Sequence, residues 1–438
     1  MRVFDEARQQ RGEKVFLLAW AAGESELPRV EEEMEELVEL ATTAGAIVVG
    51  SEIQHRARVD PALFFGRGKV EEVRALRPEL DFGMVITNDE LSPRQQRNLE
   101  DSLGVPIVDR AGLILDIFAQ HARSREGRIQ VEAAQLRHLL PRLTGGPRRS
   151  RLGGGIGTRG PGEQQLETDR RRIRTRLRSL ERDLAQVRDS RALHRAGRKR
   201  RPFQTVALIG YTNAGKSSLL NSLTAGGARS ENQMFATLDP TTRAIDLGGG
   251  PTTLLVDTVG FIQNLPQELV TAFRATLEEV AEADLLVHVL DASRAGAAAR
   301  LEAVHTTLEG LGVGERPMVL AVNKLDLCSA EARQRLSMYS SDRYLGVALV
   351  SAVTKEGLAD LRRLLSQALS SSWVAAEALI PYQDRSALEL WRRYGAVESE
   401  EFTPEGIRVE GRVPEDLLDQ ISPHPVRPAR EKVSGEDE

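Results

Sequence analysis

The sequence predicts an α/β chain with several domains, and three observations carry that prediction. Apolar runs typical of buried strands alternate with amphipathic helical patterns in the first 120 residues and again after residue 203. Two neighbouring segments with heptad spacing lie between them, in residues 121–200. A glycine-rich stretch, Gly210–Ser218, stands between an apolar run and a helical pattern. At 438 residues the chain is also too long for one typical core.

We divide the chain into five parts at its polar breaks. The basic stretch 196–202 and the serine run 370–372 interrupt the apolar patterns, and the end of the chain is rich in proline and polar residues. The parts are an N-terminal α/β domain (1–120), an antiparallel helical hairpin (121–200), a doubly wound P-loop domain (203–372), a small C-terminal α/β domain (373–421) and a disordered tail (422–438).

Composition excludes two broad classes of protein. No run approaches 18 apolar residues, so we expect no membrane span. A signal peptide is not evident, and the single cysteine, Cys328, cannot form an internal disulfide. With 41% hydrophobic and 28% charged residues, we expect a globular protein that works in the cytoplasm as a monomer.

The N-terminal part has the pattern of a parallel sheet with helices packed on it. Strands are expected over 15–20, 46–49, 83–87 and 106–109, and helices over 30–42, 68–78 and 91–103. Gly66–Lys69 precedes one of these helices. This motif is compatible with an anion site at the helix N-terminus, but a short basic turn is the plainer interpretation, and the motif alone favours it.

Two heptad series predict the hairpin. The series are Ile129, Ala133, Leu136, Leu140 and Leu143, then Leu166, Ile173, Leu177, Leu180, Leu184 and Val187. Because a loop joins them, the two helices are expected to run antiparallel and to pack along these residues. The loop, 144–162, holds eight glycines, four arginines and no acidic residue.

Charge is concentrated in this same region. Residues 121–201 contain 23 Arg and Lys against 8 Asp and Glu, a balance of +15, which leaves 36 basic against 56 acidic residues, or −20, elsewhere. A solvated helix face is one explanation, but such faces usually mix charges, and the arginines here have few acidic neighbours one turn away. We therefore expect RNA phosphates as the partner. The candidate RNA-binding residues are Arg148, Arg149, Arg151 and Arg159 in the loop, followed by the arginine-rich stretch 170–178.

Gly210–Ser218 has the Gly-x-x-x-x-Gly-Lys-Ser spacing of a phosphate-binding P-loop, between a strand and a helix. Glycines let backbone N–H groups approach phosphate oxygens, and the helix N-terminus adds positive potential. Lys216 is expected to reach the β- and γ-phosphates and Ser217 to ligate Mg²⁺. The full set of candidate phosphate-binding residues is Gly210, Tyr211, Thr212, Asn213, Ala214, Gly215, Lys216, Ser217 and Ser218.

Three further motifs follow predicted strands and select the base. Asp257, Thr258, Val259 and Gly260 form a switch II motif, in which Asp257 holds Mg²⁺ through water and the Gly260 N–H senses a γ-phosphate. Asn323, Lys324 and Asp326, with Ser351, Ala352 and Val353, form the candidate guanine site. A carboxylate at Asp326 accepts two hydrogen bonds from guanine, whereas adenine would leave it unpaired. The four motifs in this order resemble the P-loop GTPase superfamily, with GTP as the substrate.

Switch I is expected in Phe235, Ala236, Thr237, Leu238 and Asp239. By residue type Thr237, Thr241 and Thr242 are all candidates to close over Mg²⁺, and each is equally suited to capping a strand or turn. Residues 235–243, 257–262 and 154–169, together with 64–69 and 88–98, resemble the HflX family.

The resemblance covers residues from about 15 to 372 and implies more than the motifs do. It selects Thr237 as the switch I ligand of Mg²⁺. It also implies binding to the large ribosomal subunit, with the hairpin loop directed at ribosomal RNA, and a role in splitting or rescuing stalled or idle ribosomes under stress. Some members of the family hydrolyse ATP and unwind RNA through the N-terminal domain, and the C-terminal region varies.

Two residues bear on catalysis. Phe261 follows Gly260, where many GTPases carry a water-orienting glutamine, so we expect slow hydrolysis that ribosomes accelerate. Asn213 occupies the position at which some GTPases coordinate K⁺, and packing or a phosphate-side hydrogen bond is the alternative. Two other functions remain open: an ATP-dependent RNA remodeller that uses the N-terminal domain, and a regulatory GTPase with a protein partner.

Overall fold

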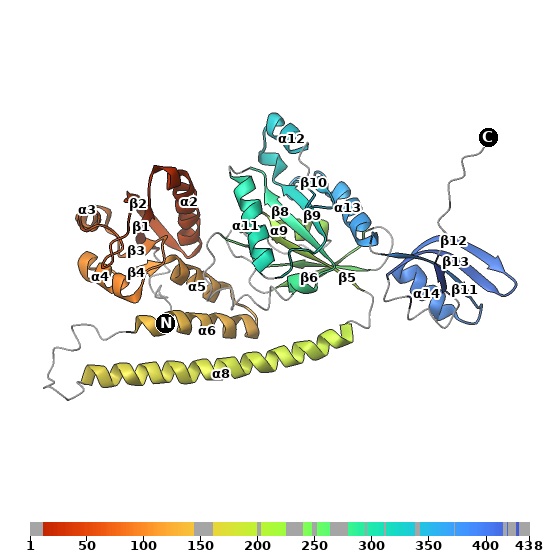
Figure 1. Cartoon of the computed structure of the whole chain (residues 1–438), viewed down its shortest axis with the longest axis horizontal. Helices are drawn as coiled ribbons and strands as arrows, with labels where there is room; N and C mark the ends of the chain where they lie inside the picture. The colour runs from red at the N-terminus through yellow and green to blue at the C-terminus, as the bar shows by residue number, and fades with distance from the viewer. Residues whose placement is uncertain are drawn as a thin grey trace. The chain divides into compact units, whose positions relative to one another are not determined.

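The computed structural model describes residues 12–143, 161–198, 203–224, 240–247, 252–262, 279–293, 296–310, 312–337, 342–371, 373–414, 418 and 426–428. Within these residues the strands form three separate sheets, in the orders β2-β1-β3-β4, β10-β9-β8-β5-β7-β6 and β12-β13-β11-β14 (Figure 1). The chain forms two compact units, one built mainly on residues 1–189 and the other on 190–231, 240–261 and 276–438.

The first sheet is entirely parallel, as the alternating pattern predicts. Its strands are β1 (Glu13–Ala21), β2 (Ala46–His55), β3 (Met84–Thr87) and β4 (Ile107–Asp109), and a short 3₁₀ turn, η1 (Glu24–Glu26), follows β1. The helices are α2 (Leu27–Thr43), α3 (Arg67–Leu80), α4 (Pro93–Leu103) and α5 (Arg110–His121). Phe16 and Leu18 of β1 share a core with α3 and α4, while α2 packs on β1 and β2, and α5 packs on β3 and β4.

Helix α5 is an element that the pattern analysis does not predict. Its residues from Arg110 to Phe118 are all buried. A helix that is covered on every side has no polar face, so it lacks the amphipathic period by which a surface helix is recognised.

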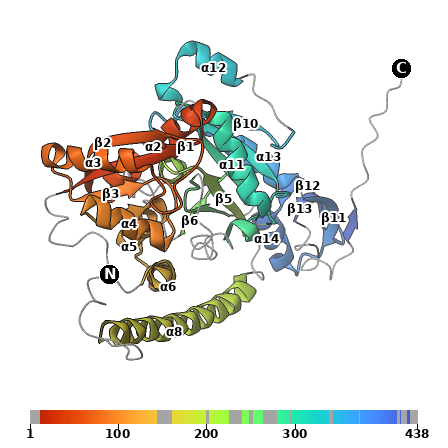
Figure 2. The same cartoon turned by 60° about the vertical axis from the view of Figure 1, so that its left-hand side comes forward.

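Helices α6 (Arg125–Arg142) and α8 (Pro161–Arg198) form the predicted hairpin. Their shared core consists of eight of the heptad residues: Ile129, Ala133, Leu136, Leu140, Ile173, Leu177, Leu180 and Leu184. Helix α8 continues without a break to Arg198, well past the last residue of the heptad series (Figure 1 and Figure 2). Among the residues that the structure describes, no helix has both the length and the apolar character needed to cross a membrane.

The second sheet has six strands, of which five are parallel and β6 runs antiparallel at one edge. The strands are β5 (Gln204–Gly210), β6 (Thr241–Ile245), β7 (Thr253–Asp257), β8 (Leu285–Asp291), β9 (Met318–Asn323) and β10 (Val347–Leu349). Helices α9 (Lys216–Leu223) and α13 (Leu358–Ser370) share a core with one face, and α11 (Ala297–Gly310) with the other. A 3₁₀ turn, η2 (Leu325–Leu327), and a short helix, α12 (Ala330–Ser337), follow β9. This is the doubly wound sheet that the sequence predicts.

The third sheet is antiparallel. It contains β11 (Val374–Ile380), β12 (Ala396–Thr403), β13 (Gly406–Val413) and β14 (Val426–Pro428), and α14 (Arg385–Tyr394) packs against it around the fully buried Trp391. The prediction of a disordered tail from residue 422 is wrong at Val426–Pro428, which pair with Ala376–Ala378 of β11. Proline-rich composition suggested disorder, but a proline at the end of an edge strand costs little, and the edge of β11 offers backbone partners. The rest of this tail lies outside the described residues.

Candidate nucleotide-binding site

The predicted nucleotide-binding residues gather at one edge of the second sheet. The P-loop follows β5, Asp257 ends β7, Asn323 ends β9, and Ser351 comes two residues after β10. Because these four strands are parallel, their carboxyl ends meet at the same edge, which is where doubly wound sheets bind ligands.

Two glycines of the P-loop are required by close approach of other chain segments. Gly210 has φ +141°, and a Cβ there would lie 2.3 Å from the carbonyl oxygen of Val289. Gly215 has φ +90°, and its Cβ would lie 2.3 Å from Nδ2 of Asn323. A side chain at either position would push apart the strands that form the site.

Lys216 is buried and its ammonium group lies within the loop. Its Nζ donates to the carbonyl oxygens of Gly210 and Tyr211, at 3.0 and 2.9 Å. Burial lowers the pKa of Lys216 to about 8, against the opposing effect of the Asp257 carboxylate. Two neutral carbonyls compensate only part of the lost hydration of a cation, so an anionic phosphate is a much stronger partner for this group.

Ser217 and Asp257 provide an oxygen pair suited to a divalent cation. The Ser217 hydroxyl donates to Oδ2 of Asp257 at 2.5 Å, which places both groups at the start of α9. Hydroxyl and carboxylate oxygens are the donors that Mg²⁺ prefers, so these residues fit the predicted metal. Ser218 lies one residue further along α9.

Switch II and the P-loop are joined by backbone hydrogen bonds. The Phe261 N–H donates to Gly210 O at 3.0 Å, and the Thr212 N–H donates to Phe261 O at 2.8 Å. The Phe261 ring is buried in the core beneath α11. A Cβ on Gly260 would lie 2.9 Å from Lys216 Nζ, so the switch II glycine lies directly against the group that is expected to reach the γ-phosphate.

Asn323 connects the P-loop to the segment after β10. Its Nδ2 donates to Ala214 O at 2.8 Å, and its Oδ1 accepts from the Ala352 N–H at 3.0 Å. The Ser351 hydroxyl donates to Oδ1 of Asp326 at 2.5 Å, which fixes the direction of that carboxylate. Val353, also predicted for this site, is 78% exposed.

Asp291 belongs to this arrangement but was not predicted. Lys324 is held in the left-handed region, at φ +67°, and its Nζ lies 2.8 Å from Oδ2 of Asp291. Burial raises the pKa of Asp291, but the hydrogen bonds and charge of Lys324, with those of Ser293, outweigh it and leave the pKa below its usual value. Its position at the end of β8 is the signal that sequence reasoning could have used.

Several predicted residues lie outside the described residues or away from the site. Switch I, residues 235–239, and the four loop arginines at 148, 149, 151 and 159 are among those that the structure does not describe. The alternative threonines, Thr241 and Thr242, lie on β6 and are exposed. On α8, Arg170 and Arg176 bind within the hairpin, to Leu143 O and to Glu132. In contrast, Arg171, Arg172, Arg174 and Arg178 are exposed.

The Gly66–Lys69 motif forms a turn that internal contacts hold. The Gly66 N–H donates to Gln54 Oε1 at 2.8 Å. Lys69 Nζ lies 2.7 Å from Glu72 and 3.4 Å from Glu52, and these carboxylates raise the pKa of Lys69. The Gly66 N–H and the Lys69 ammonium therefore both have partners, which favours the basic-turn interpretation.

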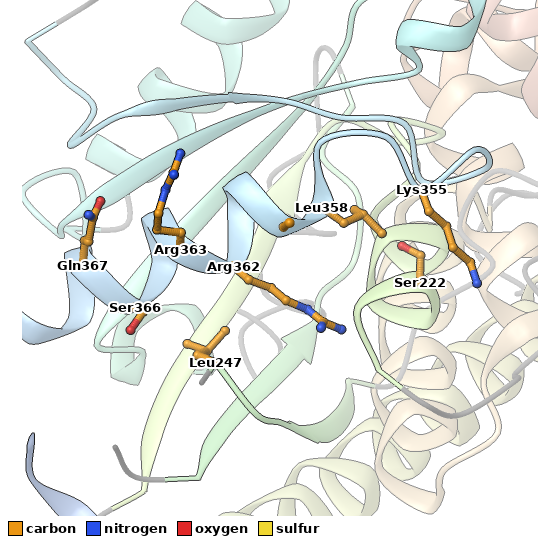
Figure 3. A pocket seen from close by; sticks show the side chains of 9 residues that line it. Ser222, Leu247, Lys355, Leu358, Arg362, Arg363, Ser366 and Gln367 are labelled. Atoms are coloured by element: carbon orange, nitrogen blue, oxygen red, sulfur yellow. The ribbon is translucent and has the colours of Figure 1, made fainter. Parts of the chain in front are cut away.

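A hollow of about 640 Å³ lies beside α13 (Figure 3). It is lined by Ser222, Leu247, Lys355, Leu358, Ala359, Arg362, Arg363, Ser366 and Gln367. Arg362 reaches across to α9 and donates to Leu223 O at 2.7 Å. This contact lies at the end of α9 opposite Lys216, so the hollow is separate from the phosphate site.

Family models and a solved structure match parts of the chain. Three family models match: "GTP-binding GTPase N-terminal" at residues 31–119, "GTP-binding GTPase Middle Region" at 121–198 and "50S ribosome-binding GTPase" at 205–324. The solved structure of SsGBP with GDP matches with a TM-score of 0.48 at 25% identity, covering 82% of this chain and 99% of that chain.

Curated relatives match over nearly the whole chain. GTPase HflX of Lacrimispora saccharolytica is 44% identical over 411 residues, covering 94% of this chain and 96% of the relative. GTPase HflX of Escherichia coli is 40% identical over 389 residues, covering 87% and 90%. Matches of this identity and extent, together with a P-loop, switch II and guanine motif at one sheet edge, show that the chain belongs to the HflX family of GTPases.

Proposed function

We propose that this GTPase binds the large ribosomal subunit in its GTP state and acts there in splitting or rescuing ribosomes, most of all under stress. Two observations support the proposal. The model that matches residues 205–324 describes a 50S ribosome-binding GTPase. The chain also carries an arginine-rich hairpin immediately before its nucleotide domain. We expect it to act as a monomer in the cytoplasm.

The nucleotide residues take the roles that their contacts allow. Lys216 leaves the carbonyls of Gly210 and Tyr211 and binds the β- and γ-phosphates, where its charge is compensated better. Ser217 and Thr237 would hold Mg²⁺ as direct ligands, and Asp257 would hold it through water. A bound Mg²⁺ neutralises charge on the phosphate oxygens. Asp326 accepts from the guanine N1–H and N2–H₂.

Asn323 serves as a positioning residue within this site. Because it binds both Ala214 O and the Ala352 N–H, it holds the P-loop and the segment 351–353 at one separation. A site that binds the phosphates and the base of one nucleotide at the same time needs that separation to be fixed. The role of Asn213 toward K⁺ stays a prediction.

The hairpin supplies the contacts to RNA. Arg148, Arg149, Arg151 and Arg159 in the loop, with the exposed arginines 171, 172, 174 and 178 of α8, give a set of cations suited to a phosphate backbone. Each phosphate neutralised releases counterions, so binding through such residues weakens steeply as salt is raised.

Hydrolysis is expected to be slow in the isolated protein. Phe261 carries no hydrogen-bonding atom in its side chain, and its ring is buried in the core rather than facing the phosphates. We propose that binding to the ribosome orders the switches and raises the rate. Single-turnover hydrolysis measured with and without large subunits tests this, and equal rates in the two conditions would disprove it.

Co-sedimentation with purified large subunits tests the ribosomal role. Binding is expected with a non-hydrolysable GTP analogue, and weaker binding with GDP or no nucleotide, because the nucleotide state sets the switches. Replacing the four loop arginines by alanine should reduce binding and lower its dependence on salt, by about one unit of slope for each phosphate that is no longer neutralised. The same protein is then mixed with whole ribosomes and followed for separation of the subunits.

A matched variant controls for overall charge. Arg58, Arg94, Arg363 and Arg408 are exposed and lie outside the hairpin, so alanine at these four positions removes the same charge. If the two quadruple variants lose binding to large subunits equally, the overall positive charge of the protein, and not the loop, determines binding. Binding that changes neither with salt concentration nor on replacement of the loop arginines would favour a regulatory GTPase with a protein partner.

The remaining alternative, an ATP-dependent RNA remodeller, has its own outcome. ATP hydrolysis that survives Asp326→Asn and is lost when the N-terminal domain is disrupted would support it. The contacts that neutralise Lys69 and occupy the Gly66 N–H make this motif a poor phosphate site, so we expect no such activity from it.

A further inference from the structure

The C-terminal end of α6 carries a set of buried polar contacts that the nucleotide site does not explain. Arg142 is the last residue of α6, and its side chain is only 14% exposed. It donates to Asp109 Oδ2 at 2.5 Å, Gln96 Oε1 at 3.0 Å and Leu91 O at 3.3 Å. These acceptors lie on the end of β4, on α4 and in the segment before α4, so one guanidinium joins the hairpin to three parts of the N-terminal domain.

Asp109 is the centre of this set. It is 2% exposed, ends β4 and caps α5, where its Oδ1 accepts from the Gly112 N–H at 2.9 Å. His138 Nε2 lies 3.2 Å from the same oxygen, and His138 Nδ1 lies 3.1 Å from Nη1 of Arg142. Because a guanidinium can only donate, Nδ1 must accept, which places the imidazole proton on Nε2, facing Asp109.

The carboxylate of Asp109 is therefore ionised at neutral pH. Burial acts to raise its pKa, but the hydrogen bond from His138, the charge of Arg142 and the Gly112 N–H together hold the pKa below its usual value. The result is a buried ion pair between the end of the hairpin helix and the carboxyl edge of the N-terminal sheet.

A second arginine binds the next residue from the opposite helix. Arg170 of α8 donates through Nε and Nη2 to Leu143 O, at 3.1 and 2.6 Å. Leu143 is the C-cap of α6, and its carbonyl has no partner within that helix. Two consecutive residues are thus held from opposite sides, Arg142 by the N-terminal domain and Leu143 by α8.

Two other polar contacts between α6 and α8 do not have this property. Arg137 pairs with Glu181 and Arg176 pairs with Glu132, in each case at the hairpin surface and with both partners inside the hairpin. Like the shared leucine core, they hold α6 against α8 and do not reach the N-terminal sheet, which α6 meets through its packing on α5 and through Arg142.

We propose that Arg142 and Asp109 form a clasp that, at the end of the packing of α6 on α5, fixes the direction in which the hairpin projects from the N-terminal domain. The clasp lies where the chain leaves α6 for the arginine-bearing loop. It therefore sets the position from which that loop meets RNA, and this consequence rests on the proposed function above. Arg142 is a positioning residue that touches neither nucleotide nor RNA.

Spin-label distances test the clasp without ribosomes. Cysteines replace Glu71 on α3 and Thr175 on α8, both exposed, in a Cys328→Ser background. We expect one narrow distance distribution in the parent protein and in Arg137→Gln, and a broad one in Arg142→Gln. Arg137→Gln is the matched control because it removes the same group from the same helix but touches only α8. A narrow, unchanged distribution in Arg142→Gln would overturn the proposal.

A milder variant covers the case in which Arg142→Gln fails to fold. Asp109→Asn keeps an oxygen to cap α5 and removes only the charge that Arg142 faces. It should also broaden the distribution. If both variants fold, keep the helical content of the parent and leave the distribution narrow, the clasp does not set the direction.

Binding to large subunits tests the consequence. Arg142→Gln should bind about tenfold more weakly than Arg137→Gln, since the loop is no longer pre-positioned. GTP affinity and unstimulated hydrolysis should stay at the parent values, because the clasp lies outside the nucleotide domain. The loss should be less than additive with alanine at the loop arginines, since both act through the same contact. Full additivity would mean that Arg142 affects binding by another route.

The two proposals fail in different ways. If the parent protein does not sediment with large subunits, the ribosomal function is wrong, and the spin-label distances still decide the clasp. If the parent binds and the distances do not respond to Arg142→Gln, the clasp is wrong and the ribosomal function stands.

Discussion

Asp326 is proposed to select guanine, and changing it to asparagine should shift the preference of the site from guanine to xanthine. The Asn side chain can still accept from the Ser351 hydroxyl, so the site stays folded. It offers guanine's N2–H₂ an amide in place of a carboxylate, and GTP affinity should fall about 100-fold, or roughly 2.7 kcal/mol. Xanthine carries a carbonyl at that position, so xanthosine triphosphate should gain affinity. Fluorescent nucleotide titrations measure both.

Glu356→Gln is the control for this change. Glu356 lies near the same segment, pairs with Arg333 at the surface and loses its charge in the same way. It should leave the preference for GTP intact. If GTP affinity falls equally in both variants, local charge and not the Asp326 contact determines the affinity.

Lys216 should couple nucleotide binding to protons. Its pKa in the nucleotide-free protein is about 8, below the usual 10.5. The unfolded chain therefore holds more protons than the folded one between those two values, and stability of the nucleotide-free protein rises with pH across that window. Phosphate favours the charged ammonium, so GTP binding should take up roughly half a proton or more at pH 8.5.

Calorimetry in buffers of different ionisation enthalpy measures this uptake. At pH 7 the ammonium is charged in both states, so Lys216 should contribute none. Lys216→Arg keeps the charge at every pH and should remove the difference between pH 7 and pH 8.5. Uptake that persists unchanged in Lys216→Arg would assign the proton to another group.

Phe261 serves packing, and its replacement should show this. Phe261→Leu keeps the backbone hydrogen bonds to Gly210 and Thr212 and replaces the buried ring by a smaller apolar side chain. We expect a loss of about 1–2 kcal/mol in stability and an unstimulated hydrolysis rate within about threefold of the parent. Thermal unfolding and single-turnover assays give the two values. A large loss of rate at unchanged GTP affinity would mean that the ring takes part in hydrolysis.

The residues at the site divide by what the sequence can reveal. Gly210, Lys216, Asp257 and Asn323 stand in motifs whose spacing is fixed by phosphate and base, so pattern alone predicts them. Asp291 and Asp109 hold their places through partners far along the chain, Lys324 for one and Arg142 for the other. Such pairs become evident only when the elements that carry them are brought together in the fold.

Among the elements, β14 is the one whose removal should have the clearest effect. It covers the edge of β11 at Ala376–Ala378. A chain that ends at residue 421 exposes these backbone groups, and an open strand edge pairs with other chains. We expect concentration-dependent association in light scattering. A chain that ends at residue 430 keeps β14 and should behave as the full chain does, and association of both would assign the effect to the missing tail.

The elements also differ in how far sequence predicts them. The strands of the first sheet and β5, β7, β9 and β10 of the second are short apolar runs that the sequence predicts, and the hairpin has a clear heptad period. Strands β6 and β8 are not among the predicted strands. Helix α5 is buried on every side and has no period to detect. Strand β14 depends on the free edge of β11, a property of the folded sheet that three residues cannot reveal.

At the level of the whole molecule, the order of the parts along the chain bears on function. The hairpin stands between the N-terminal sheet, to which Arg142 binds it, and the nucleotide domain, which begins at β5. Sequence predicts this order and the chemistry of each part from charge and motifs. The coupling between parts depends on tertiary contacts such as the Arg142–Asp109 pair, which local patterns do not encode.

The unbroken length of α8 determines how far its end moves when its direction changes. Its 38 residues form a rod about 57 Å long, with Arg170 near one end and β5 six residues beyond the other. A tilt of about 5° at the base of such a rod carries its tip about 5 Å, roughly one helical turn. A change of a few degrees in the direction of α8 would therefore move its far end far enough to exchange one phosphate contact for the next.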